Sequence, residues 1–122
     1  MMADEKVISD SGWLVRTDSR GAKKWRRDVH IRTGSDTSIR VVCTHETNVI
    51  MHIVSARVLL HTRGADSGYE FTRWFRGRGA ALRARTWCNW HIEYPPALCM
   101  HYPVESISEF SENLDEFTLP EV

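Results

Sequence analysis

The sequence predicts an α+β fold, an antiparallel sheet with helices packed on one face and continuous across a homodimer. Two observations predict it: several segments alternate apolar and polar residues with a period of two, and others repeat apolar residues at helical spacing. The 122 residues suit a single domain over residues 1–122, with 1–12 as a flexible N-terminus and 104–122 as an acidic amphipathic C-terminal helix or tail. With 42% apolar and 26% charged residues, the chain is expected to fold.

The first predicted unit is a β-hairpin. Residues 25–32 alternate polar and apolar side chains, and residues 38–44 alternate again. Gly34, Ser35 and Asp36 supply a turn between them.

Residues 48–61 are predicted to form a helix across the sheet. Val49, Ile53, Ala56 and Leu60 follow one another at helical spacing. The β-branched residues in this segment leave a strand open as the alternative.

A second hairpin is predicted from residues 69–76 and 82–94, joined through Gly77-Arg78-Gly79. Residues 82–94 alternate over thirteen positions, which is typical of a long half-buried strand. Its outward face is expected to present Arg83, Arg85 and Trp87 beside side chains of residues 69–76. Such a long exposed strand favours pairing with a second copy of the chain.

The chain is predicted to end in an acidic helix. Pro95-Pro96 ends the preceding strand, and an apolar stripe from Val104 to Phe117 repeats at helical spacing between glutamates.

Charge is segregated along the chain although the formal net charge is zero. Residues 1–10 have a net charge of −2, residues 11–103 of +8, and residues 104–122 of −6. A basic body favours an anionic partner. The alternative is that tail and body neutralise each other within one monomer.

Arginine and tryptophan dominate the chemistry of the basic body. Thirteen of the sixteen basic residues are Arg, and there are five Trp. Guanidinium groups are planar and can donate two hydrogen bonds to one phosphate, and aromatic rings stack on bases. The abundance of both arginine and tryptophan therefore indicates RNA binding. A GC-rich coding sequence and core packing remain the alternative explanations.

We therefore predict a non-enzymatic protein that binds double-stranded RNA on its sheet face. Trp13 and Trp25 are expected to stack on a terminal base pair. The residues expected to contact RNA are Arg76, Arg78, Arg83, Arg85, Lys23, Lys24, Arg26, Arg27 and Thr72.

The segment Tyr69-Glu70-Phe71-Thr72-Arg73-Trp74-Phe75-Arg76-Gly77, followed by a second strand and a helix, resembles the sheet region of the small RNA-silencing suppressors of plant tombusviruses and aureusviruses. The resemblance implies a viral homodimer that cradles a small RNA duplex on its joined sheet, with Trp residues bracketing the duplex ends. Trp13 and Trp25 are twelve residues apart, whereas the tombusvirus pattern has a close Trp pair.

Other functions have weaker support. The acidic tail, residues 106–119, suits docking into a partner groove, which suggests an interaction or transcriptional regulator. No nucleophile elbow, phosphate loop or dinucleotide turn is present, so neither catalysis nor a cofactor is expected. The longest apolar stretch is interrupted by polar residues, which indicates no membrane span and a cytoplasmic or nuclear protein.

A zinc site is a weak alternative. Cys88, His91, Cys99 and His101 offer four candidate ligands, but their spacing matches no common zinc module, and in a strand Cys88 and His91 point to opposite faces. Reduced buried thiols and surface imidazoles are expected instead.

Overall fold

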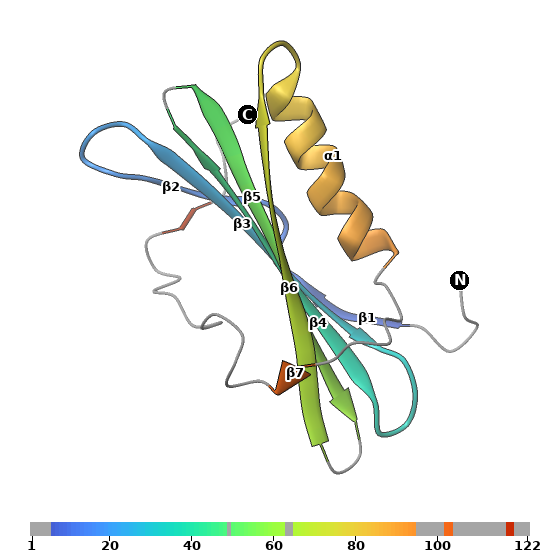
Figure 1. The fold of residues 1–122 in the computed structure, drawn as a ribbon. Coiled ribbons are helices and arrows are strands. Elements are labelled where there is room, and N and C mark those ends of the chain that lie inside the picture. Colours follow the sequence, from blue (N-terminus) through green and yellow to red (C-terminus); the bar gives the residue numbers. More distant parts are fainter. Residues whose placement is uncertain (1–5, 49, 63–64, 95–101, 104–116, 119–122) are drawn as a thin grey trace.

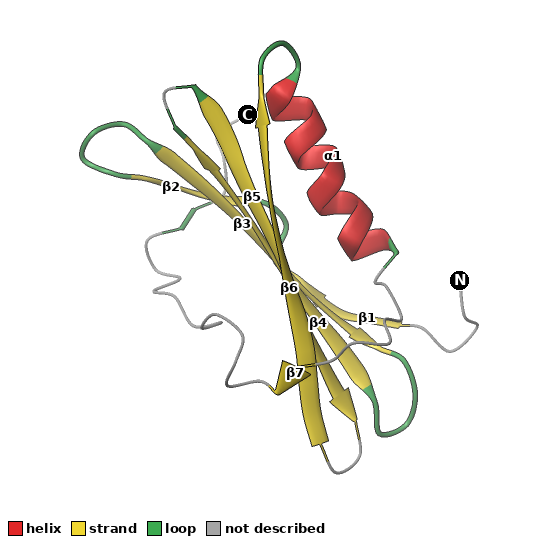
Figure 2. Ribbon diagram, viewed as in Figure 1, coloured by secondary structure: helices red, strands yellow, loops and turns green. Residues whose placement is uncertain are grey.

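The computed structural model describes residues 6–48, 50–62, 65–94, 102–103 and 117–118. Within them the chain forms seven strands, all in one sheet, and one helix (Figures 1 and 2). The elements are β1 (Lys6–Asp10), β2 (Leu14–Thr17), β3 (Lys23–Arg32), β4 (Ser38–Thr47), β5 (Met51–Thr62), β6 (Ala65–Arg76), α1 (Ala80–Glu93) and β7 (Tyr102–Pro103).

The body of the sheet is a four-stranded antiparallel meander in which β3, β4, β5 and β6 pair in sequence order. The register places Val41 of β4 between Val29 of β3 and Val58 of β5. Because side chains alternate between faces, this register puts the apolar positions of all four strands on the same side.

The two edges of the sheet differ. On one edge, β1 and β2 both pair with β3 and together form a long edge strand that breaks at Gly12, whose φ is +68°. A further bridge joins Val15 of β2 to Thr118. On the other edge, the two-residue strand β7 pairs only with Ser67 and Gly68 of β6.

Helix α1 covers one face of the sheet, packing on β4, β5 and β6 (Figure 1). We call this the helix face and the opposite side the open face. The core lies between α1 and the sheet, and its fully buried members include Val41, Cys43, Val54, Ala56, Ala84 and Cys88. The predicted α+β class, a sheet with helix packing on one face, is therefore confirmed.

The predicted hairpin of residues 25–32 and 38–44 is present as β3 and β4. The helix predicted for residues 48–61 is wrong, because this segment is the strand β5. Val54, Ala56 and Val58 are all fully buried, so the segment obeys a period of two on the helix face. The β-branched residues of this segment favour a strand, and this preference decided its structure despite the helical spacing of the apolar residues.

The strand predicted for residues 82–94 is also wrong, because these residues belong to α1. Ala80, Ala84, Cys88 and Ile92 are buried at intervals of four, the spacing of one helix face. Gly77-Arg78-Gly79 is consequently a strand-to-helix turn. Gly79 adopts a left-handed φ of +73° at the N-cap, a conformation that glycine permits without steric cost.

Both chain ends differ from expectation where they are described. Residues 6–10, expected to belong to a flexible N-terminus, form the paired strand β1. The predicted acidic helix lies outside the described residues except for Phe117 and Thr118. Phe117 is buried at 6% exposure, so this end of the tail packs on the protein itself.

Candidate nucleic-acid interface

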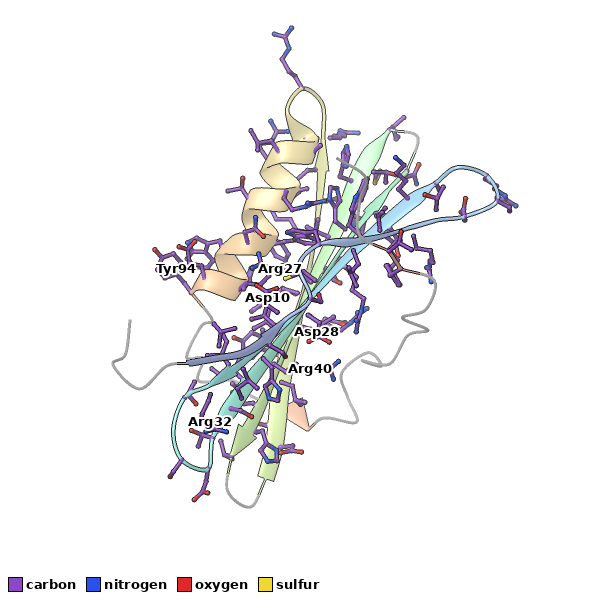
Figure 3. The ribbon with its side chains drawn as sticks, turned by 180° about the vertical axis from the view of Figure 1, so that it is seen from behind. Asp10, Arg27, Asp28, Arg32, Arg40 and Tyr94 are labelled. Carbon is purple, nitrogen blue, oxygen red and sulfur yellow. The ribbon has the colours of Figure 1, made fainter. Side chains whose placement is uncertain are left out.

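The open face carries charges of both signs that are already paired. Lys24 lies 3.2 Å from Glu46, and the buried Arg26 lies 3.7 Å from Asp28. Arg40 also donates to Asp28, at 2.6 Å. Figure 3 labels both residues. Arg57 and Glu70 form a further pair at 2.6 Å. Each of these four basic side chains of the open face therefore lies beside a carboxylate.

Arg27 is engaged on the opposite side of the sheet. Its guanidinium donates to both carboxylate oxygens of Asp10, at 3.0 and 2.6 Å (Figure 3). This contact holds the pKa of Asp10 below its usual value and raises the pKa of Arg27. A guanidinium committed in this way has little left to offer a phosphate.

Arg85 points into the molecule rather than outward. Its guanidinium carbon lies 4.0 Å from the centre of the Trp13 ring and 5.6 Å from that of Trp25. Burial lowers the pKa of Arg85, and its Nε hydrogen-bonds to none of the described residues. Both rings are half-buried here, and the Trp13 indole donates to Asn89 at 3.1 Å. End stacking on RNA would require the two tryptophans to leave these contacts.

Arg83 fastens the turn that begins α1. Its guanidinium donates to the backbone carbonyls of Arg78, at 2.8 Å, and Arg76, at 2.9 Å. These bonds hold the turn against the first turn of the helix. The side chains of Arg76, Arg78 and Arg83 are all exposed. The two hydrogen bonds from Arg83 therefore keep the three arginines together at one corner of the molecule.

This corner belongs to a larger basic surface at one end of the sheet. The β2–β3, β4–β5 and β6–α1 turns meet at this end because the strands are antiparallel (Figure 1). Its two acidic residues are Asp18, which accepts from backbone N–H groups of its own turn, and Glu46, which pairs with Lys24. We call this surface the basic end, and its seven basic residues are Arg20, Lys23, Lys24, Arg73, Arg76, Arg78 and Arg83.

An aromatic groove adjoins the basic end, between β6 and α1. It has a volume of about 380 Å³, and Phe75, Trp87 and Trp90 line it together with Arg73 and Arg83. The Trp90 side chain is 53% exposed. Trp74, on the open face of β6, is 68% exposed. Guanidinium groups and exposed rings therefore occur side by side here.

The predicted RNA contacts are thus divided among three places. Arg76, Arg78, Arg83, Lys23 and Lys24 belong to the basic end, Arg27 and Arg85 lie between sheet and helix, and Arg26 and Thr72 lie on the open face. Sequence reasoning missed Arg20, Arg73 and Trp90, and it placed Trp74 on the outward face without naming it as an RNA contact. One signal points to most of them: between Glu70 and Glu93 the chain has five arginines and no acidic residue.

The zinc hypothesis gains no support within the described residues, where no three His, Cys, Asp or Glu side chains are placed to hold a metal. The helix does put Cys88 and His91 on the same side, both buried, so the argument from opposite faces was wrong. Cys99 and His101 lie outside the described residues.

Among the residues described, α1 is too short and too polar to span a membrane. Comparisons with known proteins returned no match, whether among family models, curated proteins or solved structures.

Proposed function

We propose that this protein binds RNA through the basic end. One observation carries the proposal: Arg73, Arg76, Arg78 and Arg83 have exposed side chains at a single strand–helix corner, with no acidic residue in the chain between Glu70 and Glu93. Elsewhere on the described surface, arginines such as Arg40 and Arg57 already face carboxylates.

The chemistry of the corner suits a polyanion that also carries rings. Guanidinium groups form bidentate hydrogen bonds with phosphate, and exposed aromatic rings stack on bases. Trp74 and Trp90 are the rings within reach of the corner. The contact surface thus differs from the sheet face that the sequence suggested, while the ligand class stays the same.

The proposed ligand is double-stranded RNA. The proposed role is the one that the tombusvirus resemblance implies, sequestration of RNA duplexes by a viral suppressor of RNA silencing in the host cytoplasm or nucleus. Duplex contacts are made mainly to phosphates and 2′-hydroxyl groups, for which an exposed arginine corner is suited.

Homodimerisation through a continuous sheet is part of the proposal, and β6 is the strand that offers it. Among the described residues, no strand pairs with its outer edge from Phe71 to Arg76. An unpaired edge presents N–H and C=O groups that a second copy can pair with. The aromatic groove runs beside the same edge.

The test is RNA binding by the Arg76→Ala/Arg78→Ala double variant, measured by fluorescence anisotropy with one RNA as duplex and as single strand. We expect the duplex to bind more tightly and the double variant to lose about tenfold or more in affinity, because two phosphate contacts disappear. The matched control is Arg40→Gln, which removes an arginine already neutralised by Asp28 and should leave affinity nearly unchanged.

Equal losses in Arg40→Gln and the double variant would mean that net charge, not the corner, governs binding. No measurable RNA binding by the wild-type protein would remove the proposal altogether.

A further inference from the structure

Four polar side chains form a row across the open face at the end opposite the basic end. Arg32 of β3 is directly opposite Ser38 of β4, which is directly opposite His61 of β5, which is directly opposite Asp66 of β6. Directly opposed residues share a face, with Cβ atoms about 5 Å apart. Figure 3 shows Arg32 far from the β6–α1 turn.

Two histidines in this region have defined partners. His30 Nε2 lies 3.2 Å from Ser38 Oγ, and His61 Nδ1 hydrogen-bonds to the Asp66 carboxylate. Both histidines line one open pocket of about 820 Å³, together with Arg32. The His61 and Asp66 side chains are 63% and 47% exposed, so a polymer can reach them.

Arg32 is the one guanidinium among the described residues that line the pocket, which also holds the carboxylates of Asp36 and Asp66. This guanidinium forms no ion pair with another described residue. With Asp66 engaged by His61, Asp36 is the carboxylate among the described lining residues that opposes an anion. Two imidazoles with separate partners and one available guanidinium match the needs of phosphodiester cleavage: a base, an acid and a cation.

We propose that this pocket cleaves RNA by transfer of the scissile phosphate to the neighbouring 2′-hydroxyl. This inference goes beyond the proposed binding function, and it rests on RNA being the ligand.

The step balances without a co-reactant. Neutral His30 removes the proton from the 2′-hydroxyl, and the resulting 2′-oxygen forms a bond to phosphorus. The bond from phosphorus to the 5′-oxygen breaks, and protonated His61 donates a proton to that leaving oxygen. Arg32 stabilises the charge that develops on the phosphoryl oxygens, and Asp66 is a positioning residue for His61. The products are a 2′,3′-cyclic phosphate and a free 5′-hydroxyl.

The experiment uses the full chain and a single-stranded RNA of about 20 nucleotides, long enough to follow a ten-residue strand of roughly 33 Å. The same sequence fully 2′-O-methylated is the uncleavable probe, and EDTA is present throughout. We expect cleavage of the RNA alone, with cyclic phosphate ends in mass spectrometry. His30→Ala and His61→Ala should each lower the rate about a hundredfold or more, and Asp66→Asn by less.

The matched control is His52→Gln, a histidine outside this pocket, which should cleave at the wild-type rate. His61 is exposed, so its variant tests the proposal even if the half-buried His30 variant fails to fold. Equal cleavage by wild type and His61→Ala would overturn the inference, because the activity would then come from another source. Absence of cleavage while wild type binds the methylated probe would overturn it too and leave the proposed binding function standing. If neither single strand is bound or cleaved, this inference fails, and the duplex-binding measurement described under the proposed function decides that proposal separately.

Discussion

At the scale of single residues, the partner of each arginine decides what it can do. Arg27 lies beside Asp10, Arg40 beside Asp28, and Arg85 beside two tryptophan rings, whereas the Arg78 side chain is exposed in a turn. Composition drew attention to arginine, but it carried no information on these partners. They arise from strand register and from contacts between residues far apart in the sequence.

His45 predicts how stability depends on pH. It is 2% exposed, and burial, aided by Arg85 and His52, lowers its pKa from 6.5 to about 4. Between these two pH values the His45 imidazole is protonated in the unfolded chain and neutral in the folded protein. The free energy of unfolding therefore falls as the pH falls from about 6.5 to about 4. The full effect is about 3 kcal/mol.

Urea unfolding at pH 7 and pH 5 measures this effect. His45→Gln should show a smaller loss of stability between the two pH values than wild type. A loss of the same size in both proteins would show that His45 is not the group responsible, leaving His91, whose pKa burial also lowers.

Replacing Arg85 is predicted to have little effect on the free energy of unfolding and none on RNA affinity. Its charge is half-buried between Trp13 and Trp25 without a carboxylate partner among the described residues. Because a buried charge without an ionic partner contributes little net stability, Arg85→Met should change the free energy of unfolding by no more than about 1 kcal/mol. Its RNA affinity should equal that of wild type, and a large loss of affinity would place Arg85 in the interface after all.

At the scale of elements, residues 82–94 fit two patterns, the alternation typical of a strand and the interval of about four residues typical of one helix face. Leu82, Ala84 and Cys88 fit alternation, yet Ala84, Cys88 and Ile92 also fit one helix face, and the latter are the ones buried. The Ala, Leu and Arg content of the segment favours a helix. The strand prediction followed the alternation and did not take this helix propensity into account. In β3 and β4 the alternation and the Gly34-Ser35-Asp36 turn agreed, and that hairpin was predicted correctly.

The start of α1 depends on Gly79. Its φ of +73° is costly for a residue with a side chain, and a Cβ would lie 3.9 Å from an Arg83 nitrogen, an ordinary contact. Gly79→Ala should therefore destabilise the protein by about 1–2 kcal/mol through backbone strain alone. Thermal unfolding followed by circular dichroism checks this, and an unchanged midpoint would contradict the left-handed N-cap.

At the scale of the whole molecule, the antiparallel order brings three turns together at the basic end. It also brings polar side chains from four strands together at the pocket of His30 and His61. Neither grouping was predicted. Arg20 and Arg78 are far apart in the sequence, and the row from Arg32 to Asp66 crosses four strands. Both groupings depend on residues 51–62 forming the strand β5. The sequence predicted a helix over residues 48–61 instead, so neither grouping could be derived from it.

The edge of β6 from Phe71 to Arg76, which pairs with no other described strand, predicts the oligomeric state. Joining two sheets through β6 places the α1 helices of both copies on the same face near the seam, where Leu82 is 73% exposed. Light scattering coupled to size exclusion should give twice the chain mass for wild type and a single chain for Leu82→Glu. A wild-type protein that stays monomeric at high concentration would contradict the continuous sheet.

The salt dependence of RNA affinity tests the central claim most directly. Each phosphate neutralised on a duplex contributes about 0.9 to the slope of log affinity against log salt. Measured between 50 and 200 mM salt, the slope of the Arg76→Ala/Arg78→Ala variant should be smaller than that of wild type by about 1.8, because two contacts are lost. Identical slopes for the two proteins would mean that this corner does not meet the phosphates.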